Sequence, residues 1–246
     1  MLRSRRSYSV FIYSVQTLLR MRPSRKVFVI GLNKTGTTSL HYLLERLGYH
    51  ANHSIWWSRS NLSLRLMMYD AFSDGNPRNF DVLDRNFPGS KFILNVRDLD
   101  SWLDSRLNHV VHIENNRPDL KTGGTWSSEG HAIRESILLR NKHHLRVLWH
   151  FADRPNDLLV VNFVKDPNAA QKIADFLGKD QTVEKPHANQ KRDTDQSNLR
   201  FKEKIHKILT ELNIAEEEWS YDLVCPSLIE NPVDKNWVPD TSMRLD

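Results

Sequence analysis

The segment KVFVIGLNKTGTTSL, residues 26–40, contains the pattern on which the fold prediction rests. Its first part, Val27–Ile30, is a short apolar run rich in β-branched residues, which is typical of a buried parallel strand. From Thr37 to Leu47 the leucines recur at helical spacing, and Gly48 follows at the position where many helices end. A glycine-containing loop joins the two parts. The segment therefore predicts a strand, a loop and a helix in succession.

Two further strand–helix units follow along the chain. Residues Lys91–Val96 read KFILNV and precede an apolar helical pattern that begins near Trp102. Residues Leu158–Phe163 read LLVVNF and lead to Asp166-Pro167, an N-cap residue with proline at the first helical position, and a helix ending at Gly178. Three such units predict an α/β fold whose central parallel sheet is flanked by helices in three layers.

The whole chain is expected to divide into one domain and two terminal segments. Residues 26–215 are expected to form a single α/β domain, which includes a long helix over about 132–151. Residues 1–25 are predicted to be a basic, amphipathic extension, and the semi-apolar stretch 8–19 could contact a membrane surface. Residues 216–246 contain three prolines and are predicted to be an extended tail. We find no apolar run of about 18 residues, the length that spans a membrane.

Composition narrows the classes of ligand and compartment. The 246 residues carry a net charge of +5, which suits an anionic ligand, but the basic residues are dispersed and predict no nucleic-acid partner. The single cysteine, Cys225, excludes an internal disulfide. Asn33-Lys34-Thr35 is formally a glycosylation sequon, and a glycan there would block the loop. These features favour a cytoplasmic location.

The loop from Gly31 to Thr38 combines several features of an anion site. Gly31 and Gly36 permit tight backbone geometry, and the following helix presents unpaired N–H groups and a partial positive charge. Thr37 and Thr38 add hydroxyl groups, and Lys34 adds a full charge. In a parallel sheet, ligands bind outside the carboxyl ends of the strands, where this loop is expected. The sequence therefore predicts a phosphate-binding loop.

The loop departs from that of the ATP-using P-loop enzymes in one respect. Their lysine directly follows the second glycine, where this chain has Thr37, and Lys34 stands three places earlier. No predicted strand ends in the isolated Asp that would hold Mg²⁺, so we expect a P-loop-like fold that binds phosphate with little or no metal. A Mg-nucleotide-dependent P-loop kinase or NTPase remains the alternative. The histidines of the long helix are expected on a solvated face rather than in a metal site: His143, His144 and His150.

The segment Lys34–Thr38, KTGTT, resembles the 5′-phosphosulfate loop of the sulfotransferases that use 3′-phosphoadenosine 5′-phosphosulfate (PAPS). A second segment, FPGSKFILNVRDLDSWLDS at 87–105, resembles the 3′-phosphate motif of that family, with Arg97 and Ser105 at the matching positions. YDAFSDGNP at 69–77 resembles the compact members of the family. The resemblance implies in-line transfer of a sulfuryl group from PAPS to an acceptor hydroxyl on a small molecule or a glycan, and a carbohydrate is the acceptor that we expect.

The resemblance also implies roles for individual residues. Lys34 would neutralise charge on the leaving group, and the loop threonines with the backbone N–H groups would hold the 5′-phosphate. A late basic segment would close over the 3′-phosphate. The residues implied to bind PAPS are Lys34, Thr35, Gly36, Thr37, Thr38, Arg97, Ser105, Asn189 and Lys191.

The catalytic base is implied to be a His, Glu or Asp between the two motifs. Asp74, three residues before Pro77, fits best, and Asp70 is second. His50 and His53 follow the first helix and could also face the site. Without a working base, the chain would be a catalytically inactive protein that binds the product, adenosine 3′,5′-bisphosphate (PAP).

Three tryptophans are candidates for contact with a ligand. Trp56 and Trp57 could line an acceptor pocket or pack in the core. Trp126 lies in the glycine-containing stretch 121–130, which could act as a hinged loop that closes over a ligand.

Overall fold

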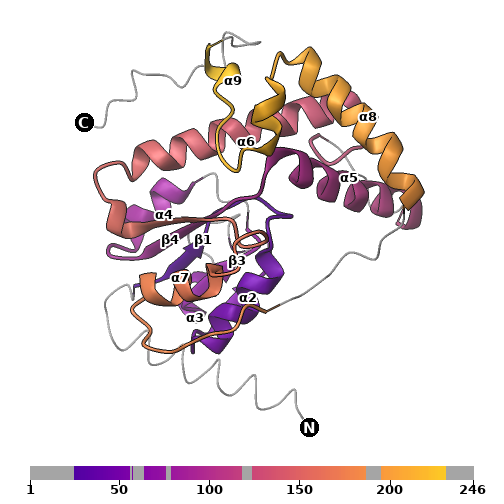
Figure 1. Ribbon diagram of the computed structural model, residues 1–246. Helices are drawn as coiled ribbons and strands as arrows, with labels where there is room; N and C mark the ends of the chain where they lie inside the picture. Colours follow the sequence, from indigo (N-terminus) through magenta and orange to yellow (C-terminus); the bar gives the residue numbers. More distant parts are fainter. Residues whose placement is uncertain are drawn as a thin grey trace. The chain divides into compact units, whose positions relative to one another are not determined.

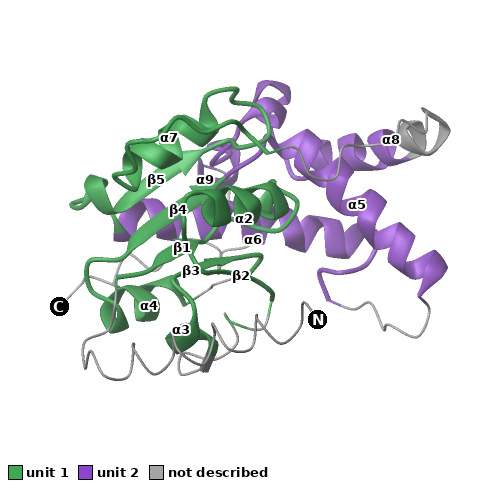
Figure 2. Cartoon of the chain, turned by 90° about the horizontal axis from the view of Figure 1, so that it is seen from below, with its two compact units in different colours: residues 1–95, 151–189 green, residues 96–150, 190–246 purple. Residues whose placement is uncertain are grey.

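The computed structural model describes residues 25–55, 57, 64–75, 79–117, 124–186 and 195–230. The chain forms two compact units (Figure 2). Unit 1 contains residues 1–95 and 151–189, and unit 2 contains residues 96–150 and 190–246. The predicted N-terminal extension, apart from Arg25, lies outside the described residues. Within the described ranges, no helix has the length and apolar character needed to cross a membrane.

Unit 1 is built on a five-stranded sheet in which every neighbouring pair is parallel (Figure 1). The strand order is β2-β3-β1-β4-β5. The strands are β1 Val27–Val29, β2 Ala51–His53, β3 Ala71–Ser73, β4 Lys91–Asn95 and β5 Leu158–Val161. The predicted class, an α/β fold with a central parallel sheet, is confirmed.

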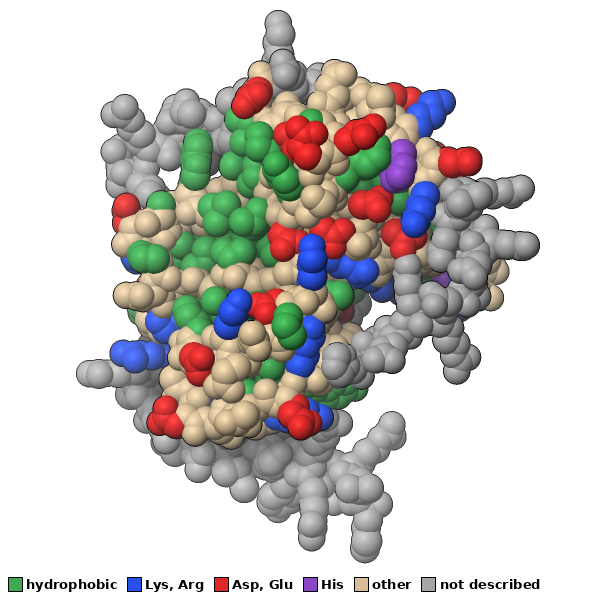
Figure 3. Space-filling model, in the orientation of Figure 1, with side chains coloured by type: hydrophobic (Ala, Val, Ile, Leu, Met, Phe, Trp, Pro, Cys, Tyr) green, Lys and Arg blue, Asp and Glu red, His purple; other side chains and the backbone are tan. Residues whose placement is uncertain are grey.

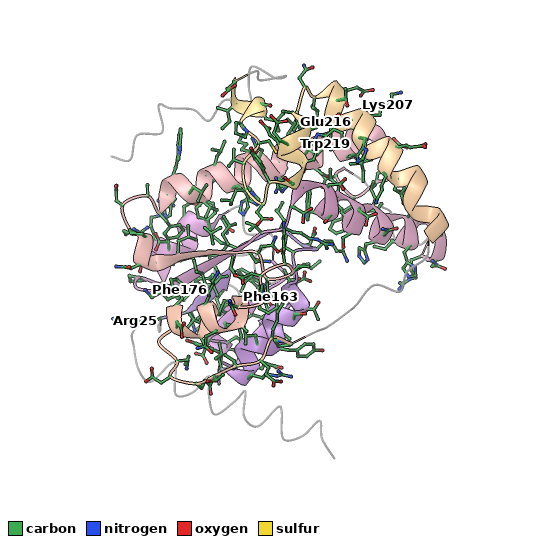
Figure 4. All side chains as sticks on the ribbon, in the orientation of Figure 1. Arg25, Phe163, Phe176, Lys207, Glu216 and Trp219 are labelled. Carbon is green, nitrogen blue, oxygen red and sulfur yellow. The ribbon has the colours of Figure 1, made fainter. Side chains whose placement is uncertain are left out.

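Helices cover the sheet of unit 1. These are α2 Thr37–Arg46, α3 Leu64–Met68, α4 Phe80–Asn86, the single turn η2 Pro155–Asp157 and α7 Ala169–Phe176. On one face, leucines of α2 and Ile173 of α7 pack against Val27 and Val29 in one buried cluster. Phe163 belongs to that cluster, and Phe176 packs against it (Figure 4).

The opposite face of the sheet carries an aromatic layer. Phe28 of β1 stacks on Phe72 of β3 and on Trp57, with ring centroids 5.4 and 5.9 Å apart. The Trp57 indole N–H donates a 2.8 Å hydrogen bond to the carbonyl of Ser73, and the ring is fully buried. Trp57 is therefore a core residue, whereas Trp56 lies outside the described residues.

Three of the strands and their helices lie where the sequence places them, but β2 and β3 were not predicted. Gly48 ends α2 with φ +85°, as expected. Helix α7 begins at Ala169, two residues later than the Asp166-Pro167 cap predicts. The reason is local: an Asp166 carboxylate oxygen accepts a 2.8 Å bond from the Asn168 N–H, which forms a turn before the helix.

Unit 2 is helical. Its elements are α5 Leu99–Asn116, α6 Gly130–His150, α8 Asp195–Glu211, η3 Glu216–Ser220 and α9 Ser227–Glu230. The prediction of an extended tail is wrong for residues 216–230, which contain two short helices. Buried Glu218 explains this, because its carboxylate accepts bonds from both the N–H and the hydroxyl of Ser227, at 3.0 and 2.8 Å. Residues 231–246 lie outside the described part.

The solvated face predicted for the α6 histidines is wrong for two of them. His143 and His144 are buried. His144 Nδ1 lies 3.2 Å from the carbonyl oxygen of Leu223, so the segment after η3 occupies the space that solvent was expected to fill. Helical periodicity in the sequence does not show which faces a later segment will cover.

Candidate active site

Asn95, the last residue of β4, holds the start of the candidate loop. Its Oδ1 accepts a 2.9 Å bond from the Gly31 N–H, and its Nδ2 donates to the hydroxyl of Thr35. The Thr35 hydroxyl in turn donates to the carbonyl of Leu32 at 2.5 Å. The Thr35 side chain therefore shapes the loop from inside. Asn95 was not predicted, although a polar residue inside the apolar run KFILNV was a usable signal.

Gly31 has no room for a side chain. A Cβ built on it would lie 2.0 Å from the carbonyl oxygen of Asn95 and 2.3 Å from the Asn95 side-chain oxygen. Such contacts are far inside van der Waals distance. The strand end and the loop thus approach each other as closely as backbone allows, which only glycine permits.

The N-terminus of α2 is prepared for an anion. Gly36 is the N-cap residue with φ +91°, and it supplies no side-chain cap. The first turn of α2 carries no acidic residue. Lys34, two residues before Gly36, also has a left-handed backbone, with φ +67°. A helix terminus without an acidic side chain retains its positive end for a bound negative group.

Thr37 and Thr38 lie beside two titratable side chains from the neighbouring strands. The Thr37 hydroxyl donates to an Asp74 carboxylate oxygen at 3.2 Å, and the Thr38 hydroxyl lies 3.4 Å from His53 Nε2. His53 Nε2 is 3.8 Å from the other Asp74 oxygen. His53 ends β2, and Asp74 follows β3, so the carboxyl ends of two adjacent strands bring them together.

His53 has the properties of a neutral base. Burial lowers the pKa of its imidazole below the usual 6.5, and the Asp74 carboxylate opposes that shift. His53 Nδ1 lies 2.9 Å from the Ser73 hydroxyl oxygen. When Nδ1 carries the proton and donates it to Ser73, Nε2 presents its lone pair between Thr38 and Asp74. Asp74 itself has an unusual backbone, with φ +61°.

Asp70 and His50 are not brought to the loop. Asp70 precedes β3 and His50 precedes β2, so both stand at the amino ends of their strands. The Asp70 carboxylate lies 3.4 Å from the His50 N–H, which donates to it, and burial raises the pKa of the Asp70 carboxyl. The His50 ring stacks on Tyr69 with centroids 4.4 Å apart. The loop follows β1 and therefore lies at the opposite, carboxyl ends of the parallel strands.

Arg97 and Ser105 lie in unit 2, at the start of α5. Asp98 caps this helix by accepting a 3.0 Å bond from the Ser101 N–H. Burial lowers the pKa of the Arg97 guanidinium, while Asp98 and Asp104 oppose the shift. Ser105 is half-buried in the second turn of the helix. Asn189 and Lys191, the other residues implied to bind the 3′-phosphate, lie outside the described part of the chain.

Trp126 packs on an arginine of α5. The Arg106 guanidinium lies 4.4 Å from the centre of the Trp126 ring and donates a 2.6 Å bond to the Thr125 carbonyl. Burial lowers the pKa of Arg106 to about 10. These contacts give Trp126 a structural partner within unit 2.

No group of three or more His, Cys, Asp or Glu side chains suited to a metal ion occurs among the residues that the structure describes.

Neither a protein-family model nor a curated protein matches the sequence. Among solved structures, the chain is similar to a sulfotransferase from Alicyclobacillus acidocaldarius, with 14% sequence identity and a TM-score of 0.47. That similarity covers 80% of this chain and 99% of the other.

Proposed function

We propose that the protein is a sulfotransferase that uses PAPS and an acceptor hydroxyl. The observation that carries the proposal is the placement of His53 and Asp74 against Thr37 and Thr38, in the first turn of an uncapped helix. A base and an anion site at one sheet edge are what group transfer to a hydroxyl requires.

The residues of the loop fit the phosphosulfate end of PAPS. The N–H groups of the first turn of α2, which itself contains no acidic residue, and the Lys34 ammonium would hold the negative 5′ group. Arg97 and Ser105 are assigned to the 3′-phosphate by their resemblance to the family motif, and Asn189 and Lys191 by the same argument. When bound, PAPS supplies the sulfuryl group that is transferred.

His53 is the group that we assign as the base, in preference to Asp74 alone. Its neutral Nε2 would take the proton of the acceptor hydroxyl, and Asp74, 3.8 Å away, would stabilise the imidazolium that results. A positioned base contributes roughly 10²–10⁴-fold to a rate. The acceptor is proposed to be a small molecule or a glycan. The catalytic domain is assigned to residues 26–215. We assign the reaction to the cytoplasm, because a glycan on Asn33 would obstruct the loop.

One observation favours a Mg-nucleotide enzyme as the second candidate. In P-loop NTPases a Ser or Thr of the loop and an Asp of a nearby strand both hold Mg²⁺. Thr37 and Asp74 form such a pair here, at 3.2 Å. The sequence did not reveal it, because β3 was not predicted and its following Asp was therefore not recognised as a residue at a strand end.

A thermal-shift titration separates the two candidates. Adenosine 3′,5′-bisphosphate without Mg²⁺ should stabilise the wild type by about 2.7 kcal/mol at 100 times its dissociation constant. Arg97→Ala should lose this stabilisation, and Arg85→Ala, which removes an exposed arginine paired with Asp81, should retain it. Stabilisation by Mg-ATP, with none by the bisphosphate, would overturn the sulfotransferase proposal.

Turnover distinguishes an enzyme from an inactive binding protein. PAPS labelled in the sulfuryl group is incubated with a panel of sugars and simple alcohols, and labelled product is counted. His53→Gln should bind the bisphosphate like wild type and lose roughly 10²-fold or more in rate. A wild type that binds the bisphosphate and transfers label to none of the panel would support the inactive binding protein instead.

A further inference from the structure

Arg140 in the middle of α6 is buried, with 2% of its surface exposed, and its guanidinium is surrounded by backbone carbonyl groups. Nη1 donates to the carbonyl of Leu223 at 2.7 Å. Nη2 lies within 3.0 Å of three further carbonyl oxygens, those of Arg97, Tyr221 and Asp222. Three of these four acceptors belong to residues 221–225, which we call the C-terminal strap.

Other residues of unit 2 fasten the strap in place. Asn141, next to Arg140, pairs with both backbone groups of Cys225: its Oδ1 accepts from the N–H at 2.6 Å, and its Nδ2 donates to the carbonyl at 3.4 Å. The Leu99 N–H, in the first turn of α5, donates to the Tyr221 carbonyl at 3.2 Å. The strap is thus bonded both to α6 and to the start of α5.

The fourth acceptor of Arg140 is the carbonyl of Arg97, and this bond connects the strap to the phosphate motif. The chain turns from an extended backbone into α5 at Asp98, the N-cap residue. Arg140 fixes the peptide group directly before this residue, and the strap fixes the N–H directly after it. The backbone that carries the Arg97 side chain is therefore held on both sides of the turn. Charge-assisted bonds of this kind are stronger than bonds between neutral groups.

We propose that Arg140, through the C-terminal strap, is a positioning residue for the 3′-phosphate site. It holds the Arg97 backbone so that the guanidinium of Arg97 and the hydroxyl of Ser105 can bind the same phosphate group. This inference rests on the proposed function, since it assumes that Arg97 binds the 3′-phosphate. Arg140 itself makes no contact with the ligand in this scheme.

The test compares two ligands that differ only in the group concerned. Adenosine 3′,5′-bisphosphate carries the 3′-phosphate, and adenosine 5′-monophosphate lacks it. Calorimetry should show that Arg140→Lys lowers the affinity for the bisphosphate by about tenfold, equivalent to about 1.4 kcal/mol, and leaves the affinity for the monophosphate unchanged. Arg134→Lys, the same exchange at a partly exposed position of α6, should leave both affinities as in wild type.

A double-mutant cycle shows whether Arg140 acts through Arg97. In the Arg97→Ala background, Arg140→Lys should have no further effect on either ligand. Additive losses, or equal losses for both ligands in the single variant, would overturn this inference and leave the proposed function intact. A wild type that does not prefer the bisphosphate would overturn both.

A second variant covers the case in which Arg140→Lys does not fold. Asn141→Ala removes the fastening of the strap at Cys225 and leaves Arg140 in place. It should show the same selective loss for the bisphosphate, smaller in size. If a folded Asn141→Ala protein, checked by circular dichroism, binds both ligands like wild type, the strap has no positioning role.

Discussion

At the scale of single residues, Gly31 has the most demanding environment in the loop. We predict that Gly31→Ala destabilises the protein by more than about 3 kcal/mol, because the added methyl group would overlap the Asn95 carbonyl and overpacking at this level already costs 1–3 kcal/mol. Denaturant unfolding followed by circular dichroism measures this. Gly130→Ala is the matched control, because Gly130, like Gly31, has no positive φ, and its added Cβ would contact only Ile208 Cδ1, at 3.9 Å.

The control should be as stable as wild type or slightly more stable, because alanine at a position with a compatible backbone lowers the entropy of the unfolded chain. Equal losses in the two variants would mean that the loop moves away from Asn95 without resistance. The close approach of the loop to β4 would then not be needed for stability.

The pKa of His53 is the second prediction at this scale. Burial lowers it below 6.5, and the Asp74 carboxylate partly restores it. Removing that charge with Asp74→Asn should therefore lower the pKa of His53 further. NMR titration of the imidazole C–H resonances, assigned with His53→Gln, measures both values.

The lowered pKa of His53 has a consequence for catalysis. A base must be neutral, so activity should rise with pH through the pKa of His53, and the midpoint of this rise should lie below pH 6.5, which is the unperturbed pKa of histidine. In Asp74→Asn the acidic limb should move to lower pH. A rise of the His53 pKa in that variant would contradict the pairing of these two side chains.

At the scale of elements, His144 makes the stability of the α6–strap contact dependent on pH. Its folded-state pKa lies well below 6.5, chiefly because the ring is buried and also because Arg140 and His143 are close. Below pH 6.5 the unfolded chain binds a proton that the folded chain refuses, so stability should fall as the pH decreases from that value. His144→Gln should show a shallower loss between pH 6.5 and 5, measured by urea unfolding. An unchanged slope would mean that His144 is protonated equally in both states.

The elements also show what the sequence could predict. β1, β4 and β5 are apolar runs of four to six residues in the sequence, and α2 has leucines at helical spacing and a terminal glycine, so local pattern was sufficient. β2 and β3 are three residues each, ANH and AFS, which is too short for any periodicity. They are strands because β3 pairs with both β1 and β2, a long-range condition.

The same difference between local pattern and long-range contacts applies to the candidate site. The loop residues form one continuous segment, and Arg97 and Ser105 lie within a second segment, so local sequence pattern was sufficient to propose both as site residues. The association of His53 with Asp74 depends on the order of β2 and β3 in the sheet, so Asp74 was predicted for its spacing to a proline and His53 only as one of two histidines. The role of Asn95 and the strap depends on contacts between residues more than 60 positions apart.

At the scale of the whole molecule, we predict that the net charge of +5 favours the binding of an anionic ligand. Acidic and basic side chains both occur on the face shown in Figure 3, so the excess of positive charge is a property of the whole chain and not of a single-sign patch on this face. The dissociation constant for adenosine 3′,5′-bisphosphate should increase between 0.05 and 0.5 M NaCl, because salt weakens the attraction between exposed charges. The screening length is about 8 Å at physiological ionic strength and decreases as salt is added. Calorimetry at both salt concentrations tests this, with uncharged adenosine as the control. Equal salt dependence for the two ligands would show that charge does not drive binding.

The bonds from Asn95 to Gly31 and Thr35 have a consequence for protein engineering. A designer might treat the loop as a cassette that can be transplanted into another nucleotide-binding scaffold. Its shape, however, is encoded partly on β4, because the Asn95 amide bonds to two loop residues and its carbonyl leaves no space for a methyl group on Gly31. A transplanted loop would therefore require an asparagine at the end of the recipient's adjacent strand. In a recipient that lacks this asparagine, the transplanted loop would have the same sequence but would not adopt the same conformation.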